Sequence, residues 1–233
     1  MNQLILKCQN FLKDFRYTYA VCGGYALELF TGKNWRTHSD LDITLFNADR
    51  KNIISYMLSK GWNVYEPLHT TSSLRLITNP NDEGTLNRHY IWGIKPGCTF
   101  IKIKPKPDED SIFLYEILNK EQLHFDFIDI IFNDQQDGAF ICNKSKNIVR
   151  KLDKAILHHK GIPYLAPEII LFFISNPAYI ESDYHREKTN ADWKSIPSFL
   201  PKESLKWLAD AIRAAYPDGN KRLDELITLT DNR

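Results

Sequence analysis

The hydrophobic pattern of the first sixty residues alternates between helix and strand. Apolar residues three and four apart mark one face of a helix, and short continuous apolar runs mark buried strands. The elements predicted on this basis are a helix on Leu4, Cys8, Phe11, Leu12 and Phe15, a strand at 19–22, a helix on Tyr25, Ala26, Leu29 and Phe30, a strand from Ile43, and a helix capped by Asn47 and ended by Gly61.

The pattern changes twice further along the chain. Strand-like segments dominate the middle, and we predict them at 62–65, 73–77, 89–94, 99–104, 124–132 and 139–142, with a turn at 133–138 before the last. After Gly161 helices dominate, one opening at 164–168 with Pro167 in its first turn, followed by helices around 186–193, after Pro201 and around 223–227. This order predicts an α+β fold: a mixed-sheet catalytic domain at 1–155 and a small helical C-terminal domain at 156–233.

Composition narrows the class of protein. The chain has 233 residues and a formal net charge of +1, without the clustered basic face that nucleic-acid binding requires. It shows neither a signal-peptide pattern nor an apolar run long enough to span a bilayer, so we expect a cytoplasmic protein without nucleic-acid or membrane partners, as a monomer or homodimer. The four cysteines are far apart and indicate reduced thiols rather than disulfides.

The strongest chemical signal is the stretch 23–46. Gly23 and Gly24 stand at a strand-to-helix turn, where backbone N–H groups can approach an anion such as a phosphate. Asp40 and Asp42 follow, and side chains two apart on a strand share a face at a spacing of about 7 Å. Two such carboxylates suit a divalent cation. A Gly-Gly turn or an Asp-x-Asp pair alone is usually structural, but their succession favours metal-assisted phosphoryl or nucleotidyl transfer.

This stretch resembles the signature of the DNA polymerase β-type nucleotidyltransferase superfamily. The matching pattern is Gly23-Gly24-x-Ala26-Leu27-x-Leu29-Phe30-x-Gly32-(x)3-Arg36-x-His38-x-Asp40-Leu41-Asp42-Ile43. It is most similar to the branch of aminoglycoside 2″-adenylyltransferases and lincosamide nucleotidyltransferases, which also has Gly-Gly where the superfamily often has Gly-Ser. The segment 161–171 and the pattern Arg186-x-Lys188-(x)3-Asp192-Trp193 resemble the same branch.

The resemblance implies an enzyme, a metal-dependent nucleotidyltransferase. A hydroxyl of a small molecule, such as an aminoglycoside- or lincosamide-like antibiotic, attacks the α-phosphate of a nucleoside triphosphate, expected to be ATP, and pyrophosphate leaves. Asp40 and Asp42 hold Mg²⁺, and a third carboxylate on the strand 127–132 serves as base or metal ligand. Two alternatives are an enzyme that modifies a protein or RNA, as toxin–antitoxin members of the superfamily do, and a silent nucleotide-binding relative.

The third carboxylate is Asp126 or Asp129, which face opposite sides of a regular strand. We predict Asp129, because it lies in an apolar strand where an ionised group is costly without a partner, whereas water is expected to reach Asp126. Arg36, His38 and Lys188 are the predicted side-chain contacts to the nucleotide phosphates. For each of these three a solvated or ion-paired side chain is an equally good interpretation, and a pair with Asp192 would explain Lys188.

Overall fold

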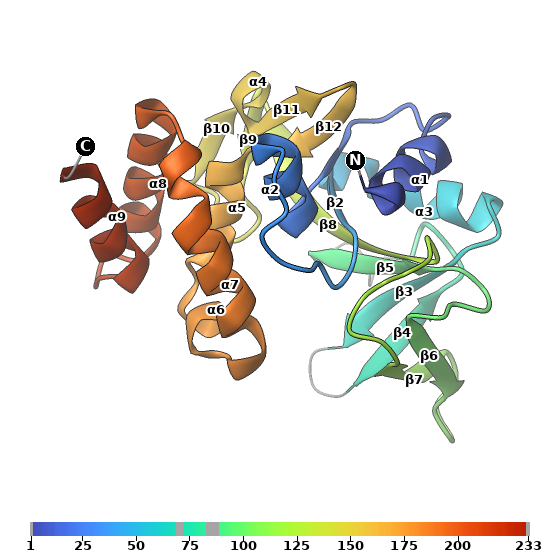
Figure 1. The fold of residues 1–233 in the computed structure, drawn as a ribbon. Coiled ribbons are helices and arrows are strands. Elements are labelled where there is room, and N and C mark those ends of the chain that lie inside the picture. Colours follow the sequence, from blue (N-terminus) through green and yellow to red (C-terminus); the bar gives the residue numbers. More distant parts are fainter. Residues whose placement is uncertain (1, 69–71, 83–88, 232–233) are drawn as a thin grey trace. The chain divides into compact units, whose positions relative to one another are not determined.

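The computed structural model describes residues 2–68, 72–82 and 89–231 (Figure 1). The chain forms two compact units. One comprises residues 1–21 and 38–135, and the other comprises residues 22–37 and 136–233. The segment with the paired glycines therefore clusters with the C-terminal part of the chain, and a domain division at 155/156 stays a prediction.

The first unit combines one large sheet with helices. Its helices are α1 (Gln3–Phe11), the short 3-10 helix η1 (Asn47–Asp49) and α3 (Arg50–Ser59). Its strands are β1 (Tyr19–Val21), β2 (Asp42–Phe46), β3 (Asn63–Leu68), β4 (Ser73–Ile77), β5 (Tyr90–Ile94), β6 (Ile101–Pro105), β7 (Ile112–Ile117) and β8 (Phe127–Gln136).

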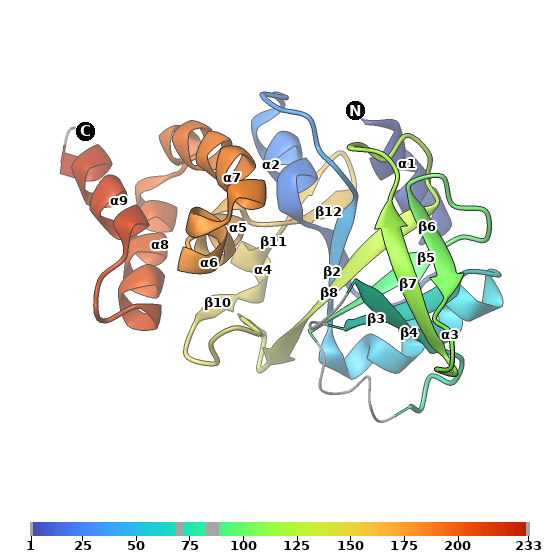
Figure 2. The same ribbon diagram turned by 90° about the horizontal axis from the view of Figure 1, so that it is seen from below.

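The strands of this unit follow the order β1-β2-β8-β5-β3-β4-β7-β6. Figure 2 shows the strands from β2 to β8 from below. Strands β2 and β8 run parallel, and every other neighbouring pair in this series is antiparallel. The sheet is therefore mixed, as the α+β prediction requires. The parallel pair brings together two segments that are more than eighty residues apart in the chain.

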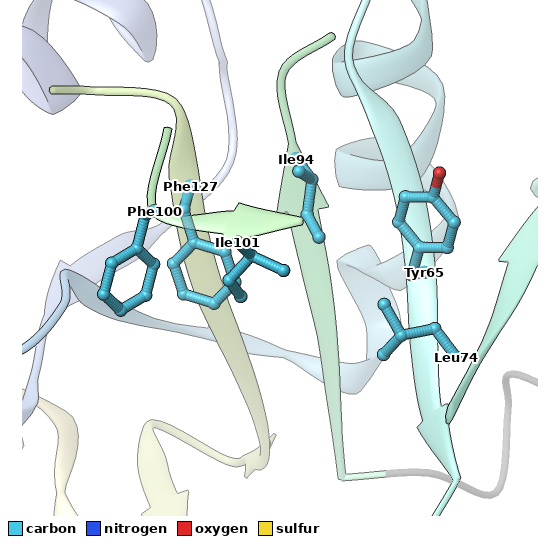
Figure 3. Packing of buried hydrophobic residues seen from close by; sticks show 6 residues of the cluster. All are labelled: Tyr65, Leu74, Ile94, Phe100, Ile101 and Phe127. Atoms are coloured by element: carbon cyan, nitrogen blue, oxygen red, sulfur yellow. The ribbon is translucent and has the colours of Figure 1, made fainter. Parts of the chain in front are cut away.

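An aromatic and aliphatic core fixes the strands around β8. It consists of Tyr65, Leu74, Ile94, Phe100, Ile101 and Phe127, drawn in Figure 3. A second aromatic contact joins the helices, since the Phe11 ring of α1 lies 5.5 Å from that of Tyr56 in α3 and 5.0 Å from that of Trp62. Ring pairs at these distances add to the hydrophobic stabilisation. Strand β8 of the parallel pair thus packs into this core through Phe127.

The second unit is mostly helical but also contains short strands. Its helices are α2 (Gly23–Thr31), α4 (Leu152–Ala155), α5 (Pro167–Ile174), α6 (Pro177–Glu181), α7 (Asp183–Ser195), the 3-10 helix η3 (Pro197–Phe199), α8 (Lys202–Ala215) and α9 (Lys221–Asp231). Its strands are β9 (Ala139–Ile141), β10 (Val149–Lys151), β11 (Ile156–His159) and β12 (Ile162–Leu165). Strands β9 and β10 pair antiparallel, as do β11 and β12.

A buried ion pair ties strand β10 to the helices of the second unit. Arg150 donates to Glu168 at 2.6 Å, and the hydroxyl of Ser204 donates to the same carboxylate oxygen at 2.9 Å. These residues come from β10, α5 and α8, and helices α8 and α9 lie side by side in both views (Figures 1 and 2). Glu168, expected from the sequence at the start of a helix, is thus a structural partner of Arg150.

Three local predictions were wrong. The segment before Pro167 is strand β12, because its residues pair with β11 rather than starting the helix. Strand β8 continues to Gln136, and the turn is confined to Asp137 and Gly138, which both have positive φ. Asn47 lies in η1 and its side chain donates to Asp134 at 2.7 Å instead of capping a helix. In each case a contact far along the chain or across a strand pair overrides the local signal.

The buried pair gives a prediction about stability. Glu168→Ala leaves the Arg150 charge buried without its main partner, which costs about 3–5 kcal/mol of the free energy of unfolding. Glu203→Ala is the matched control, since Glu203 lies 3.6 Å from the same guanidinium but its side chain is 67% exposed. That variant is expected to stay within about 0.5 kcal/mol of wild type. Urea unfolding monitored by circular dichroism measures both, and equal losses would contradict the assignment.

Candidate functional site

Two of the predicted metal ligands lie side by side in the first unit. Asp42 is the first residue of β2, and its direct partner in the parallel pair is Asp129 of β8. Paired residues of neighbouring strands present their side chains to the same face of a sheet. The structure therefore brings together two of the three carboxylates, from segments that the sequence places far apart.

Asp40 precedes the strand rather than lying on it, since β2 begins at Asp42. Its carboxylate accepts a hydrogen bond from the Ser39 hydroxyl. Its charge nevertheless acts on Asp129, whose pKa it raises. Asp40 is thus an electrostatic neighbour of Asp129, although it was expected to lie on the same strand as Asp42.

Burial is the main cause of the electrostatic state of Asp129. Its pKa is raised to about 8, first by desolvation and second by the negative charge of Asp40. The Trp92 indole and the Ile130 N–H act in the opposite direction, although the indole N–H and the Asp129 Oδ1 atom make no hydrogen bond of ordinary geometry. The residue as a whole is half-buried, but Oδ1 has no contact with solvent. The apo protein therefore favours a protonated Asp129 at neutral pH.

The donor set fits a hard divalent cation. Carboxylate oxygens are the ligands that Mg²⁺ prefers. A cation would offset both the desolvation cost of an ionised Asp129 and its repulsion by Asp40. Among the described residues, no three His, Cys, Asp or Glu side chains stand ready as a complete metal cage.

Asp126, the rejected candidate, has a structural role. Its Oδ2 atom accepts from the backbone N–H and the hydroxyl of Thr99, each at 2.8 Å. The expectation that water reaches it was wrong, because Asp126 is 7% exposed. It lines a pocket of about 560 Å³ whose other walls include Phe11, Trp62 and Lys95, and the aspartates at 40, 42 and 129 do not line this pocket. Asp126 precedes β8, and its carboxylate is thus separated from that of Asp129.

The predicted phosphate-binding turn lies at the start of α2 in the second unit. Gly23 is the first residue of this helix and has a φ of 60°, whereas Gly24 does not have a positive φ. The left-handed backbone that favours glycine therefore falls at Gly23. The role of both residues as amide donors to a triphosphate stays a prediction.

Arg36 forms an ion pair with Asp192, which was expected to be a partner of Lys188. Its Nε and Nη2 atoms donate to the two carboxylate oxygens of Asp192 at 2.7 and 2.6 Å, and the Trp35 indole donates to the same carboxylate at 3.0 Å. Asp192 lies on α7, one helical turn after the half-buried Lys188. A guanidinium in a bidentate pair is fixed in place and largely neutralised.

The second unit thus holds Arg36 and Lys188 on or against α7, while His38 is buried in the first unit. Contacts of these three residues to phosphate stay predictions. Asp192 as the partner of Arg36 was missed, because a pair 156 residues apart leaves no local pattern. The one available signal was the Asp192-Trp193 motif, from which Asp192 was expected to pair only with Lys188.

Adjacent carboxylates on parallel strands of a mixed sheet, with a Gly-Gly helix start earlier in the chain, are compatible with metal-assisted nucleotidyl transfer. The family model of the aminoglycoside-2''-adenylyltransferase matches residues 4–141, more than half of the chain. The chain therefore belongs to the aminoglycoside-2''-adenylyltransferase family, and it is a nucleotidyltransferase. The resemblance inferred from the motif is confirmed.

Several solved structures are similar at low sequence identity. The lincosamide antibiotic adenylyltransferase LnuA with bound lincomycin is 16% identical, with 84% of this chain and 98% of that chain covered and a TM-score of 0.46. The antibiotic-resistance factor ANT(2'')-Ia in solution is 17% identical, with 92% of each chain covered and a TM-score of 0.49. The crystal structure of ANT(2'')-Ia with adenylyl-2''-tobramycin is 14% identical, with 93% and 99% covered and a TM-score of 0.47. A search of curated protein sequences gave no match.

None of the helices that the structure describes is long and apolar enough to cross a membrane.

The four cysteines are free thiols, and Cys8, Cys22 and Cys142 are buried. Burial raises the pKa of Cys8 and of Cys142 to about 12 each, so both thiols stay protonated at neutral pH.

The raised pKa of Asp129 predicts how the stability of the metal-free protein depends on pH. Between the ordinary Asp pKa and about 8 the folded state binds a proton that the unfolded state has lost, so this group lowers stability as pH rises through that window. Asp129→Asn removes the effect. In the presence of chelator, the stability of this variant relative to wild type should increase from pH 5 to pH 8. Thermal unfolding at both pH values measures it, and a constant difference would show that Asp129 has an ordinary pKa.

Proposed function

We propose that the protein transfers AMP from ATP to a hydroxyl of a small molecule of the aminoglycoside or lincosamide class, with Mg²⁺ bound by Asp40, Asp42 and Asp129. The observation that carries this proposal is the pairing of Asp42 with Asp129 inside a chain of the aminoglycoside-2''-adenylyltransferase family. The family match favours a small-molecule acceptor over a protein or an RNA.

In the proposed reaction the acceptor hydroxyl forms a bond to the α-phosphorus, the bond to the β-phosphate oxygen breaks, and pyrophosphate leaves. When bound, the metal ion neutralises charge on the phosphates and orients them. Asp129, which must first lose its own proton in exchange for the bound cation, accepts the hydroxyl proton. Its burial suits this role, because desolvation strengthens a carboxylate as a base. Asp40 and Asp42 supply the remaining carboxylate oxygens, and the amides of Gly23 and Gly24 bind the triphosphate.

The proposal is tested by a pyrophosphate-release screen. The purified protein is incubated with Mg²⁺, each of the four nucleoside triphosphates, and a panel of aminoglycosides, lincosamides and unrelated polyols. Release with ATP and one antibiotic class, with a product heavier by one AMP group in mass spectrometry, is the expected result. Release only with a protein or RNA acceptor would contradict the proposed acceptor while leaving the family assignment intact.

The proposed metal site predicts that ATP binding depends on a divalent ion. Without the ion, the triphosphate charges face two or three carboxylates, so we expect the affinity for ATP to fall at least tenfold in chelator or in Asp42→Ala. Isothermal calorimetry measures this. The control is Asp14→Ala, because Asp14 is an exposed carboxylate of the same unit with a weak 3.8 Å contact to Lys60. Equal affinity with and without metal would refute the site.

The assignment of Asp129 as the base predicts that substitutions of Asp129 and of Asp126 have different effects on turnover and on stability. Asp129→Asn should keep the fold and lower turnover by roughly a hundredfold or more, the scale of a lost general base. Asp126→Asn should lower the unfolding temperature, because it disturbs the contacts to Thr99, and should keep turnover within about threefold in the folded protein. Steady-state kinetics beside thermal unfolding separate the two effects. A loss of turnover confined to Asp126→Asn would move the base to that residue.

A further inference from the structure

The side-chain amide of Gln122 lies between the segment that carries Asp40 and the beginning of β8. Its Oε1 atom accepts a hydrogen bond from the Leu41 N–H at 3.1 Å, and its Nε2 atom donates to the Phe127 carbonyl at 2.8 Å. Phe127 is the first residue of β8. One carboxamide therefore joins the backbones that lead into the two halves of the carboxylate site.

Two further bonds fix this amide. Its Nε2 atom also donates to the His124 carbonyl at 2.8 Å, and the backbone N–H of Gln122 donates to the Ser39 carbonyl at 2.7 Å. Gln122 is 4% exposed, so these bonds are made away from solvent. Asp40 is thereby held on both sides, through the carbonyl before it and the N–H after it.

The side-chain amide of Gln122 lies just before the first residue pair of β2 and β8. The parallel register of β2 and β8 begins with Asp42 and Asp129, and just before it the Asp129 N–H donates to the Leu41 carbonyl at 3.1 Å. The Leu41 N–H is satisfied by the Gln122 side chain. A buried backbone donor requires a partner, and here a side-chain amide takes the place of a neighbouring strand.

We propose that Gln122 is a positioning residue of the metal site: its amide holds the segment Ser39–Leu41 against β8, so that Asp40 keeps its place beside Asp42 and Asp129. The proposal rests on the proposed function in one respect, that these aspartates bind a metal–triphosphate. Groups that orient metal ligands without touching the metal typically change its affinity tenfold to a hundredfold when replaced.

Asn133 provides a matched control. It is also a fully buried carboxamide, and its Nδ2 atom donates to the Thr44 hydroxyl at 2.9 Å, which again joins β8 to β2. This contact lies at the other end of the parallel pair, where Asn133 is opposite Phe46. Loss of either amide should destabilise the unit, but only loss of Gln122 should disturb the aspartates.

The experiment compares Gln122→Met and Asn133→Leu, which remove each amide while keeping most of the volume. Amide hydrogen exchange by NMR in the metal-free protein reads the segment directly, and calorimetry reads the affinity for Mg–ATP, both at a temperature where circular dichroism shows folded protein. We expect at least tenfold faster exchange at Leu41 and at least tenfold weaker Mg–ATP binding in Gln122→Met. Asn133→Leu should match wild type in both measurements.

Wild-type exchange at Leu41 in Gln122→Met, or an equal loss of affinity in both variants, would overturn the proposal. If Gln122→Met does not fold, Gln122→Asn keeps the amide on a stem one methylene shorter that cannot span both backbones, and the same two losses are expected. If the wild type does not bind Mg–ATP, the proposed function fails. The exchange rate at Leu41 then still decides whether Gln122 holds this segment.

Discussion

The candidate site depends on the parallel pairing of β2 with β8. This pairing sets Asp42 directly opposite Asp129 and so places two carboxyl groups on one face of the sheet. Strands that run parallel cannot be joined by a tight turn, and here the connection between them contains α3 and five strands of the first unit. The aromatic core around Phe127 stabilises the strands, and this stabilisation offsets the unfavourable electrostatic energy of the aspartate cluster.

Packing and chemistry make opposite demands on Asp129. Its neighbours in β8, Ile128 and Ile130, are fully buried and supply the apolar contacts that keep the strand in place. The same burial raises the pKa of Asp129 to about 8. A solvated carboxylate would stabilise the apo protein more and would be a weaker base near neutral pH. The stability that the fold gives up at this position is therefore the condition for the proposed acid–base role.

Much of this site could be predicted from the sequence, since the Asp-x-Asp pair, the apolar strand around Asp129 and the Gly-Gly turn are all local patterns. Strand alternation allowed only one of Asp126 and Asp129 to join the cluster, and the apolar residues around Asp129 decided the choice. The pairing of Asp129 with Asp42 agrees with it. The partners of Arg36 and of Leu41 could not be predicted. Asp192 and Gln122 are 156 and 81 residues away from them, and nothing in the chain marks a single buried side chain as the end of such a contact.

The buried acids of this chain have different partners. Glu168 forms an ion pair with Arg150, Glu66 with Arg75 and Asp192 with Arg36. The buried Asp126 accepts two hydrogen bonds from Thr99. Asp129 instead has another carboxylate, Asp40, as the charged neighbour that raises its pKa. An acid beside an arginine contributes to a defined structure, whereas an acid held beside another acid stabilises nothing until a cation or a proton arrives. That difference supports the proposed role of Asp129 more strongly than burial alone does.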